Sequence, residues 1–137
     1  MSRRSALVAG LALSAALAGA LVVVAALPPA AVRIEMRIHY SHFTPDAVTV
    51  PHGVPVTFVL VNEDPIDHEW LIGDDAFHAR HRTGTEPVHG DRPNEVSLPG
   101  FATRETTLTF AAPTTLLYVC HFPGHEAYGM VGTLTIT

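Results

Sequence analysis

The chain has 137 residues, which allows one domain and little else. Hydrophobic residues make up 47% of it and charged residues only 15%, and the apolar excess lies at the N-terminus. Beyond residue 31 there are six basic residues and all 13 acidic residues, which gives this part a net charge of −7. Nucleic-acid binding needs a basic patch, so the composition argues against it.

The N-terminus carries the pattern of an export signal. Arg3 and Arg4 precede an uncharged apolar run at residues 6–27. Cleavable apolar regions usually have about 7–15 residues, whereas about 20 can span a bilayer as a helix, so a cleaved signal and a membrane anchor both remain open. In either case the two arginines stay inside. The protein is therefore expected to be periplasmic, secreted or anchored to the outer face of the cytoplasmic membrane.

Beyond the N-terminal region of residues 1–31, whose last four residues read as a linker, the sequence predicts an all-β domain at residues 32–137. Apolar and polar residues alternate at 32–40, which indicates a half-buried strand. Further strands are predicted at 47–50, 54–61, 68–72, 94–98, 104–110, 115–120 and 132–137. Residues 73–93 break this rhythm, and Asp74 is predicted to cap a short helix ending near Gly84. About eight short strands predict a β-sandwich, preceded by an apolar helix.

The end of the chain carries a metal-binding pattern. Cys120 is the only cysteine, so it forms no internal disulfide, and a free thiol outside the cytoplasm needs a role such as metal ligation. His125 follows five residues later and Met130 five after that. Two histidines, a cysteine and a weak axial methionine are the ligands of blue copper. The second histidine is best supplied by His68, which follows a strand and a turn containing Pro65.

At these residues the domain resembles the cupredoxins, the plastocyanin and azurin family, over roughly residues 34–137. Its Cys-x4-His-x4-Met loop with a Phe-Pro-Gly-His core is most similar to the auracyanin type. The earlier matching positions are Phe43-Thr44-Pro45, Val48, Val50, Gly53, Val56-Thr57-Phe58, Asn62 and His68. The resemblance implies a Greek-key β-sandwich holding one type 1 copper on His68, Cys120, His125 and Met130.

One position departs from this family. Many members have a small polar residue, often asparagine, after the first histidine, and its hydrogen bond lies near the thiolate. Here Glu69 and Trp70 follow His68. Hydrogen bonds around the sulfur tune the reduction potential, so no potential is carried over from a relative.

Other residues receive more modest interpretations. Asn62 is interpreted as a turn residue that ties the ligand loop. An apolar patch for a redox partner is suggested around the edge of His125, with ordinary packing as the alternative; its members would be Phe122, Ala127 and Tyr128. Three histidines of residues 73–93 could bind a second metal, although histidines in such a segment are more commonly solvated. These three are His78, His81 and His89. The early histidines are expected at the surface; these are His39, His42 and His52.

The sequence predicts a one-electron carrier that cycles between Cu(I) and Cu(II), works with redox partner proteins and is a monomer. The alternative is a copper-binding protein for transport, storage or resistance. An enzyme is not expected, because copper enzymes of this kind need a second copper centre. His121 follows Cys120, but Val119 precedes it, so the histidine pair that serves the copper cluster of multicopper oxidases is incomplete. The second cysteine of a dinuclear copper site is replaced by Gly124.

Overall fold

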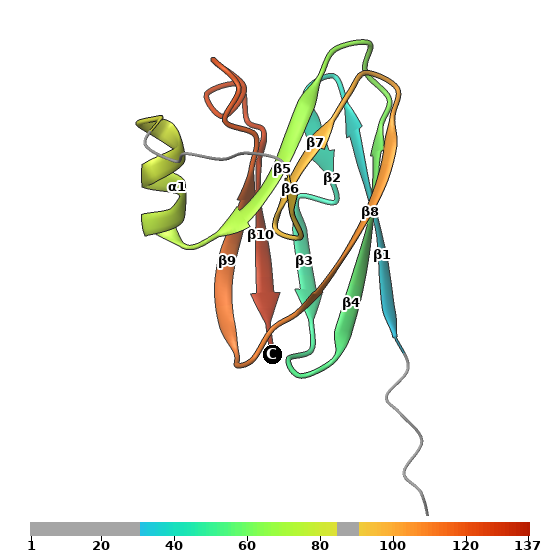
Figure 1. The fold of residues 1–137 in the computed structure, drawn as a ribbon, viewed down its shortest axis with the longest axis vertical. Coiled ribbons are helices and arrows are strands. Elements are labelled where there is room, and N and C mark those ends of the chain that lie inside the picture. The colour runs from blue at the N-terminus through green and yellow to red at the C-terminus, as the bar shows by residue number, and fades with distance from the viewer. Residues whose placement is uncertain (1–30, 85–90) are drawn as a thin grey trace, which may run out of the picture.

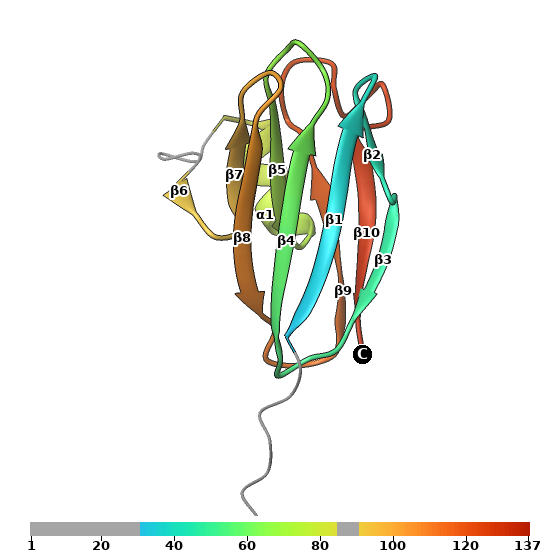
Figure 2. The same cartoon turned by 90° about the vertical axis from the view of Figure 1, so that its right-hand side faces the viewer.

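The computed structural model describes residues 31–84 and 91–137, and these form a two-layer β-sandwich with one helix at its side (Figures 1 and 2). The first sheet has the order β2 (His42–Thr44), β1 (Val32–His39), β4 (Pro55–Asn62) and β8 (Thr103–Thr109). The second sheet has the order β3 (Ala47–Val50), β10 (Val131–Ile136), β9 (Thr114–Val119), β5 (His68–Gly73), β7 (Glu95–Leu98) and β6 (Asp91–Arg92). The helix is α1 (Asp75–Arg82).

Each sheet buries one face because polar and apolar residues alternate along its strands. In β1, Met36 and Ile38 point into the core, while Glu35 and Arg37 face solvent and pair with each other at 2.7 Å. β1 pairs in parallel with β4, and β3 with β10, and the other neighbours are antiparallel. The predicted sandwich of the cupredoxin type is confirmed.

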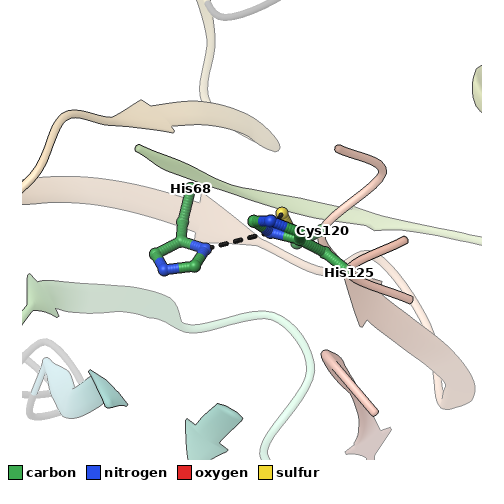
Figure 3. A group of neighbouring side chains, drawn as sticks. All are labelled: His68, Cys120 and His125. Atoms are coloured by element: carbon green, nitrogen blue, oxygen red, sulfur yellow. Dashed lines mark hydrogen bonds between the residues drawn. The ribbon is translucent and has the colours of Figure 1, made fainter. Parts of the chain in front are cut away.

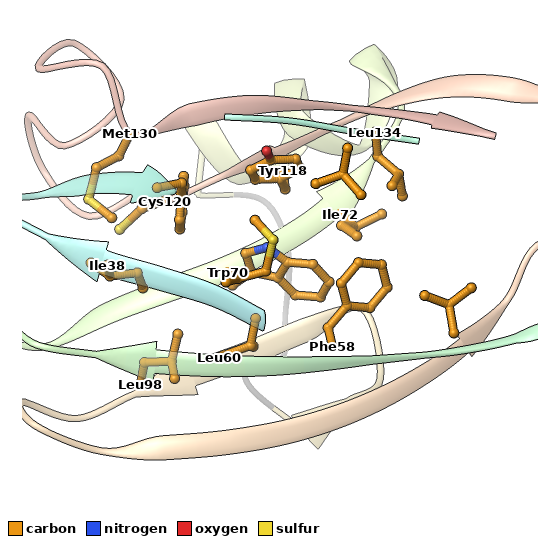
Figure 4. Packing of buried hydrophobic residues seen from close by; sticks show 14 of the residues in the cluster. Ile38, Phe58, Leu60, Trp70, Ile72, Leu98, Tyr118, Cys120, Met130 and Leu134 are labelled. Atoms are coloured by element: carbon orange, nitrogen blue, oxygen red, sulfur yellow. The ribbon is translucent and has the colours of Figure 1, made fainter. Parts of the chain in front are cut away.

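The core between the sheets is built on aromatic contacts (Figure 4). Phe58 on β4 meets Trp70 on β5 with ring centroids 4.8 Å apart, and Tyr118 on β9 lies 6.3 Å beyond Trp70. All three side chains are buried. Burying each such side chain contributes about 1.5–3 kcal/mol, so this centre holds the two sheets in a fixed relation.

The strand directions gather four loops at one end of the sandwich, the upper end in Figure 1. β5 and β9 are antiparallel neighbours in which Leu71 pairs with Val119. The first residue of β5 and the residue after β9 therefore lie at the same end, and these are His68 and Cys120. The turn between β1 and β2, and the loop between β7 and β8, border the same place.

The predicted helix is confirmed: the Asp74 carboxylate accepts a hydrogen bond from Phe77 N at 2.8 Å and caps α1. Two strands were not predicted, β2 and β6, because they have three and two residues and are too short to show alternation. The predicted N-terminal apolar helix and His89 lie outside the described residues. Among the residues that are described, no helix is long and apolar enough to cross a membrane.

Candidate metal centre

Three of the four predicted ligands converge at the upper end of the sandwich (Figure 3). Their donor atoms all lie within 4.8 Å of one another. Nδ1 of His125 is 3.2 Å from Nδ1 of His68 and 3.3 Å from Sγ of Cys120. His68 and Cys120 are fully buried, whereas His125 is partly exposed. The site is therefore closed on the protein side and reaches solvent through one imidazole edge.

A buried carboxylate orients His68. Nε2 of His68 lies 3.0 Å from Oδ2 of Asp64, and since an ionised carboxylate only accepts, this nitrogen carries the hydrogen. Nδ1 is thus left with a lone pair facing Cys120 and His125. A ligating histidine whose outer N–H is held by a carboxylate is typical of metal sites.

Asp64 is itself fixed by the turn between β1 and β2. Tyr40 and Ser41 both have positive φ, 50° and 54°, and their successive N–H groups donate to the Asp64 carboxylate at 2.7 and 2.8 Å. Burial by itself would raise the pKa of Asp64, but these two N–H groups and His68 hold it below its ordinary value. Asp64 is thus an ionised partner of the site that the sequence did not reveal.

Asn62 ties the two loops that flank His68. Its Nδ2 lies 2.9, 3.1 and 3.0 Å from the carbonyl oxygens of Ile66, Leu98 and Pro99. Its Oδ1 accepts from Asp64 N at 3.0 Å. The interpretation of Asn62 as a turn residue that holds the ligand loop is supported by these contacts.

The loop from Cys120 to Met130 is closed by its own backbone. Cys120 N donates to Met130 O at 3.1 Å, and Met130 N donates to His125 O at 3.0 Å. Gly124 and Gly129 adopt φ values of 84° and 102°, which other residues rarely adopt. Met130 is fully buried and belongs to the same core cluster as Cys120, and Figure 4 shows both side chains toward the same end of the core.

The thiol of Cys120 lies in an environment that disfavours its ionised form. Burial raises its pKa to about 11, although the backbone N–H groups of Glu69 and Phe122 donate to the sulfur and oppose this shift. Glu69 also accepts at Oε1 from His121 N at 2.8 Å and so links the two ligand segments. Glu69 stands where many family members have a small polar residue. The sulfur therefore accepts from backbone N–H groups, while the Glu69 carboxylate binds the neighbouring loop.

Two imidazole nitrogens, one thiol and one nearby thioether form a donor set that fits copper. The soft sulfurs favour Cu(I), and imidazole binds both oxidation states. The chain is therefore a copper protein in which His68, Cys120 and His125, together with Met130, form a type 1 copper-like site.

Comparison with known proteins gives the same class. A model of the copper binding proteins of the plastocyanin/azurin family matches residues 30–137, and the chain belongs to this family. It is 33% identical over 135 residues to the copper-resistant cuproprotein CopI of Pseudomonas aeruginosa, covering 75% of each chain. It is 31% identical over 110 residues to auracyanin-B of Chloroflexus aurantiacus, covering 69% of this chain and 47% of that protein. A solved structure of auracyanin B superposes with a TM-score of 0.65 at 28% identity, covering 82% and 93% of the two chains.

The interpretation of the helix histidines as solvated was wrong. His78 and His81 lie on α1, and they are 0% and 6% exposed. The reason is that α1 lies against β5 and β9 and turns this face inward. The early histidines are exposed as expected; these are His39, His42 and His52.

Proposed function

We propose that this protein is an exported carrier of single electrons, with one copper held by His68, Cys120, His125 and Met130. The observation that carries the proposal is that the donor atoms of three of these residues, His68, Cys120 and His125, lie within 4.8 Å of one another. Copper supplies the one-electron Cu(I)/Cu(II) couple. Ligands fixed by hydrogen bonds serve both oxidation states with little rearrangement, which favours electron transfer over catalysis.

The surface around the site supports docking of a protein redox partner. Among the described residues, the exposed large hydrophobic side chains all lie in loops or strand ends at the metal end of the sandwich: Tyr40, Ile66, Phe101, Tyr128 and Val131. Tyr128 belongs to the ligand loop and is 71% exposed, and His125 is partly exposed close by in the same loop. An apolar face around a metal ligand suits brief contact with an apolar face of a partner. We propose that a monomer presents this face.

Export is proposed from the sequence alone. Arg3, Arg4 and the apolar run at 6–27 place the domain outside the cytoplasm in both the cleaved and the anchored form. A reporter fused after Thr137 is expected outside the cytoplasm, and a cytoplasmic reporter would contradict the proposal. Retention of the protein on salt-washed membranes indicates an anchor, and release indicates cleavage.

A second candidate is a role in copper resistance, which the 33% identity to a copper-resistant cuproprotein favours. The two roles differ in what happens on reduction: a carrier keeps its copper, and a transport or storage protein delivers it. The test is voltammetry of the copper-loaded full chain, followed by reduction beside a Cu(I) chelator. A reversible one-electron wave with copper retained is expected. Transfer of the copper to the chelator on reduction would favour the resistance role.

A further inference from the structure

A second pair of histidines faces each other outside the copper centre. His78 lies on α1, and His121 follows β9. His78 is 0% exposed, and the side chain of His121 is 5% exposed. Nδ1 of His78 lies 2.9 Å from Nε2 of His121. Two buried imidazoles therefore meet nitrogen to nitrogen.

The outer nitrogens of this pair each face an acceptor. Nε2 of His78 is 3.2 Å from Leu117 O, and Nδ1 of His121 is 3.3 Å from Oε2 of Glu126. Arg82 binds the Glu126 carboxylate through Nε at 3.0 and 2.9 Å. A carbonyl and a carboxylate only accept, so each of these two contacts requires a hydrogen on the outer imidazole nitrogen.

The contacts of this pair need one hydrogen more than two neutral imidazoles carry. Each neutral ring has one N–H, whereas the contacts with Leu117, with Glu126 and between the two rings each require one. If the 2.9 Å contact between the rings is a hydrogen bond, one outer nitrogen faces its acceptor without a hydrogen. A cation between the inner nitrogens, either an added proton or a metal ion, lets both outer nitrogens keep their hydrogens. Histidines whose outer N–H groups are held by a carbonyl and a carboxylate have the support that metal-bound histidines have.

We propose that Nδ1 of His78 and Nε2 of His121 bind a second copper ion as Cu(I), at a site separate from the His68, Cys120 and His125 centre. Two neutral donors in a buried place suit a single positive charge, because a divalent ion costs more to desolvate. Imidazole is a good copper ligand. With metal–nitrogen bonds of about 2.0 Å, the two nitrogens must separate to about 3.3–4 Å.

The His121 side of this site is bordered by the ring of His81 and by a surface pocket. The ring of His81 stacks on His121 at 5.7 Å and 17°, and its Nδ1 lies 2.9 Å from Phe77 O. His81 thus supports the His121 ring, while its own Nδ1 is engaged by the helix. A surface pocket of about 350 Å³, lined in part by Arg82, His121 and Glu126, borders one member of the pair.

The test is an anaerobic titration of the full-length chain with Cu(I) against a chelator of known affinity. The wild type is expected to bind two equivalents, His78→Leu one, and the control His52→Leu, at an exposed histidine in the turn after β3, two. The visible spectrum of the Cu(II)-loaded centre should be unchanged in His78→Leu. A single equivalent in the wild type, or a second equivalent that survives in His78→Leu, would overturn the proposal.

A measurement on the wild type keeps the test decisive if His78→Leu fails to fold. Nitrogen-15 NMR of the imidazoles should show Nδ1 of His78 and Nε2 of His121 shifting together as the second equivalent is added. Shifts confined to other histidines would exclude the pair. Because the first copper is followed by its Cu(II) spectrum, failure of the second site leaves the electron-carrier proposal standing.

Discussion

Replacing Asp64 by asparagine removes a buried negative charge 3.0 Å from the outer nitrogen of His68. The substitution keeps the size of the side chain, but it replaces one carboxylate oxygen by an NH2 group, so the amide carbonyl accepts from Tyr40 N or Ser41 N and no longer from both. The change that acts on the copper through the imidazole is the loss of the charge. Cu(II) carries one positive charge more than Cu(I), so the oxidised state loses more stabilisation and the reduction potential should rise.

The size of the rise can be worked from the contact. Adding the width of an imidazole ring and a metal–nitrogen bond of about 2.0 Å to the 3.0 Å contact places the carboxylate about 7 Å from the metal. At an effective dielectric constant of about 20, one unit charge at that distance contributes about 2 kcal/mol. Since about 2.3 kcal/mol corresponds to 100 mV for one electron, Asp64→Asn should raise the potential by about 100 mV.

Voltammetry of the copper-loaded protein measures this shift, with Asp67→Asn as the matched control. Asp67 lies in the same loop and is exposed, and it accepts from Gly100 N at 2.9 Å, a bond that asparagine can keep. Water screens its charge, so its shift should be at most about a quarter as large. Equal shifts in the two variants, or a lower potential in Asp64→Asn, would refute the role given to Asp64.

Two further predictions concern the sulfur ligands. Met130→Leu should keep the copper and its colour but raise the reduction potential, because a weak donor that stabilises Cu(II) is lost. The near-equal volume of the two side chains should limit the loss of stability to less than about 1.5 kcal/mol. Loss of copper binding in a dialysis assay would make Met130 a principal ligand instead. In the metal-free protein the pKa of Cys120 is raised from 9.0 to about 11, so the unfolded state loses the thiol proton first and the free energy of unfolding should fall by about 2–3 kcal/mol as the pH rises through that window. Urea titrations should show this slope in the wild type and a weaker one in Cys120→Ser, and identical slopes would contradict it.

Local patterns explain why much of the fold could be predicted. The strand β1 and the cap of α1 are encoded within a few residues, by alternation in one case and by Asp74 in the other. The ligands Cys120, His125 and Met130 share one loop, so their spacing alone identifies copper. His68 was reached by a less direct route, through the argument that one end of a sandwich collects the strand ends.

Contacts between distant segments could not be predicted in this way. Asp64 acts on His68 only because the turn at Tyr40 and Ser41 supplies two N–H groups from another part of the chain. His78 and His121 are 43 residues apart and meet only because α1 lies against the second sheet. No periodicity or sequence motif marks such partners, because they come into contact only when the two sheets and the helix pack against one another.

The most direct test of the central claim is visible absorption during titration of the metal-free full chain with Cu(II). Thiolate bound to Cu(II) in a type 1 site gives an intense charge-transfer band, so one equivalent should turn the protein blue or green. Cys120→Ser should stay colourless while its far-ultraviolet circular dichroism matches the wild type. A wild-type protein that binds one Cu(II) and remains colourless would contradict a copper centre built on Cys120, His68 and His125.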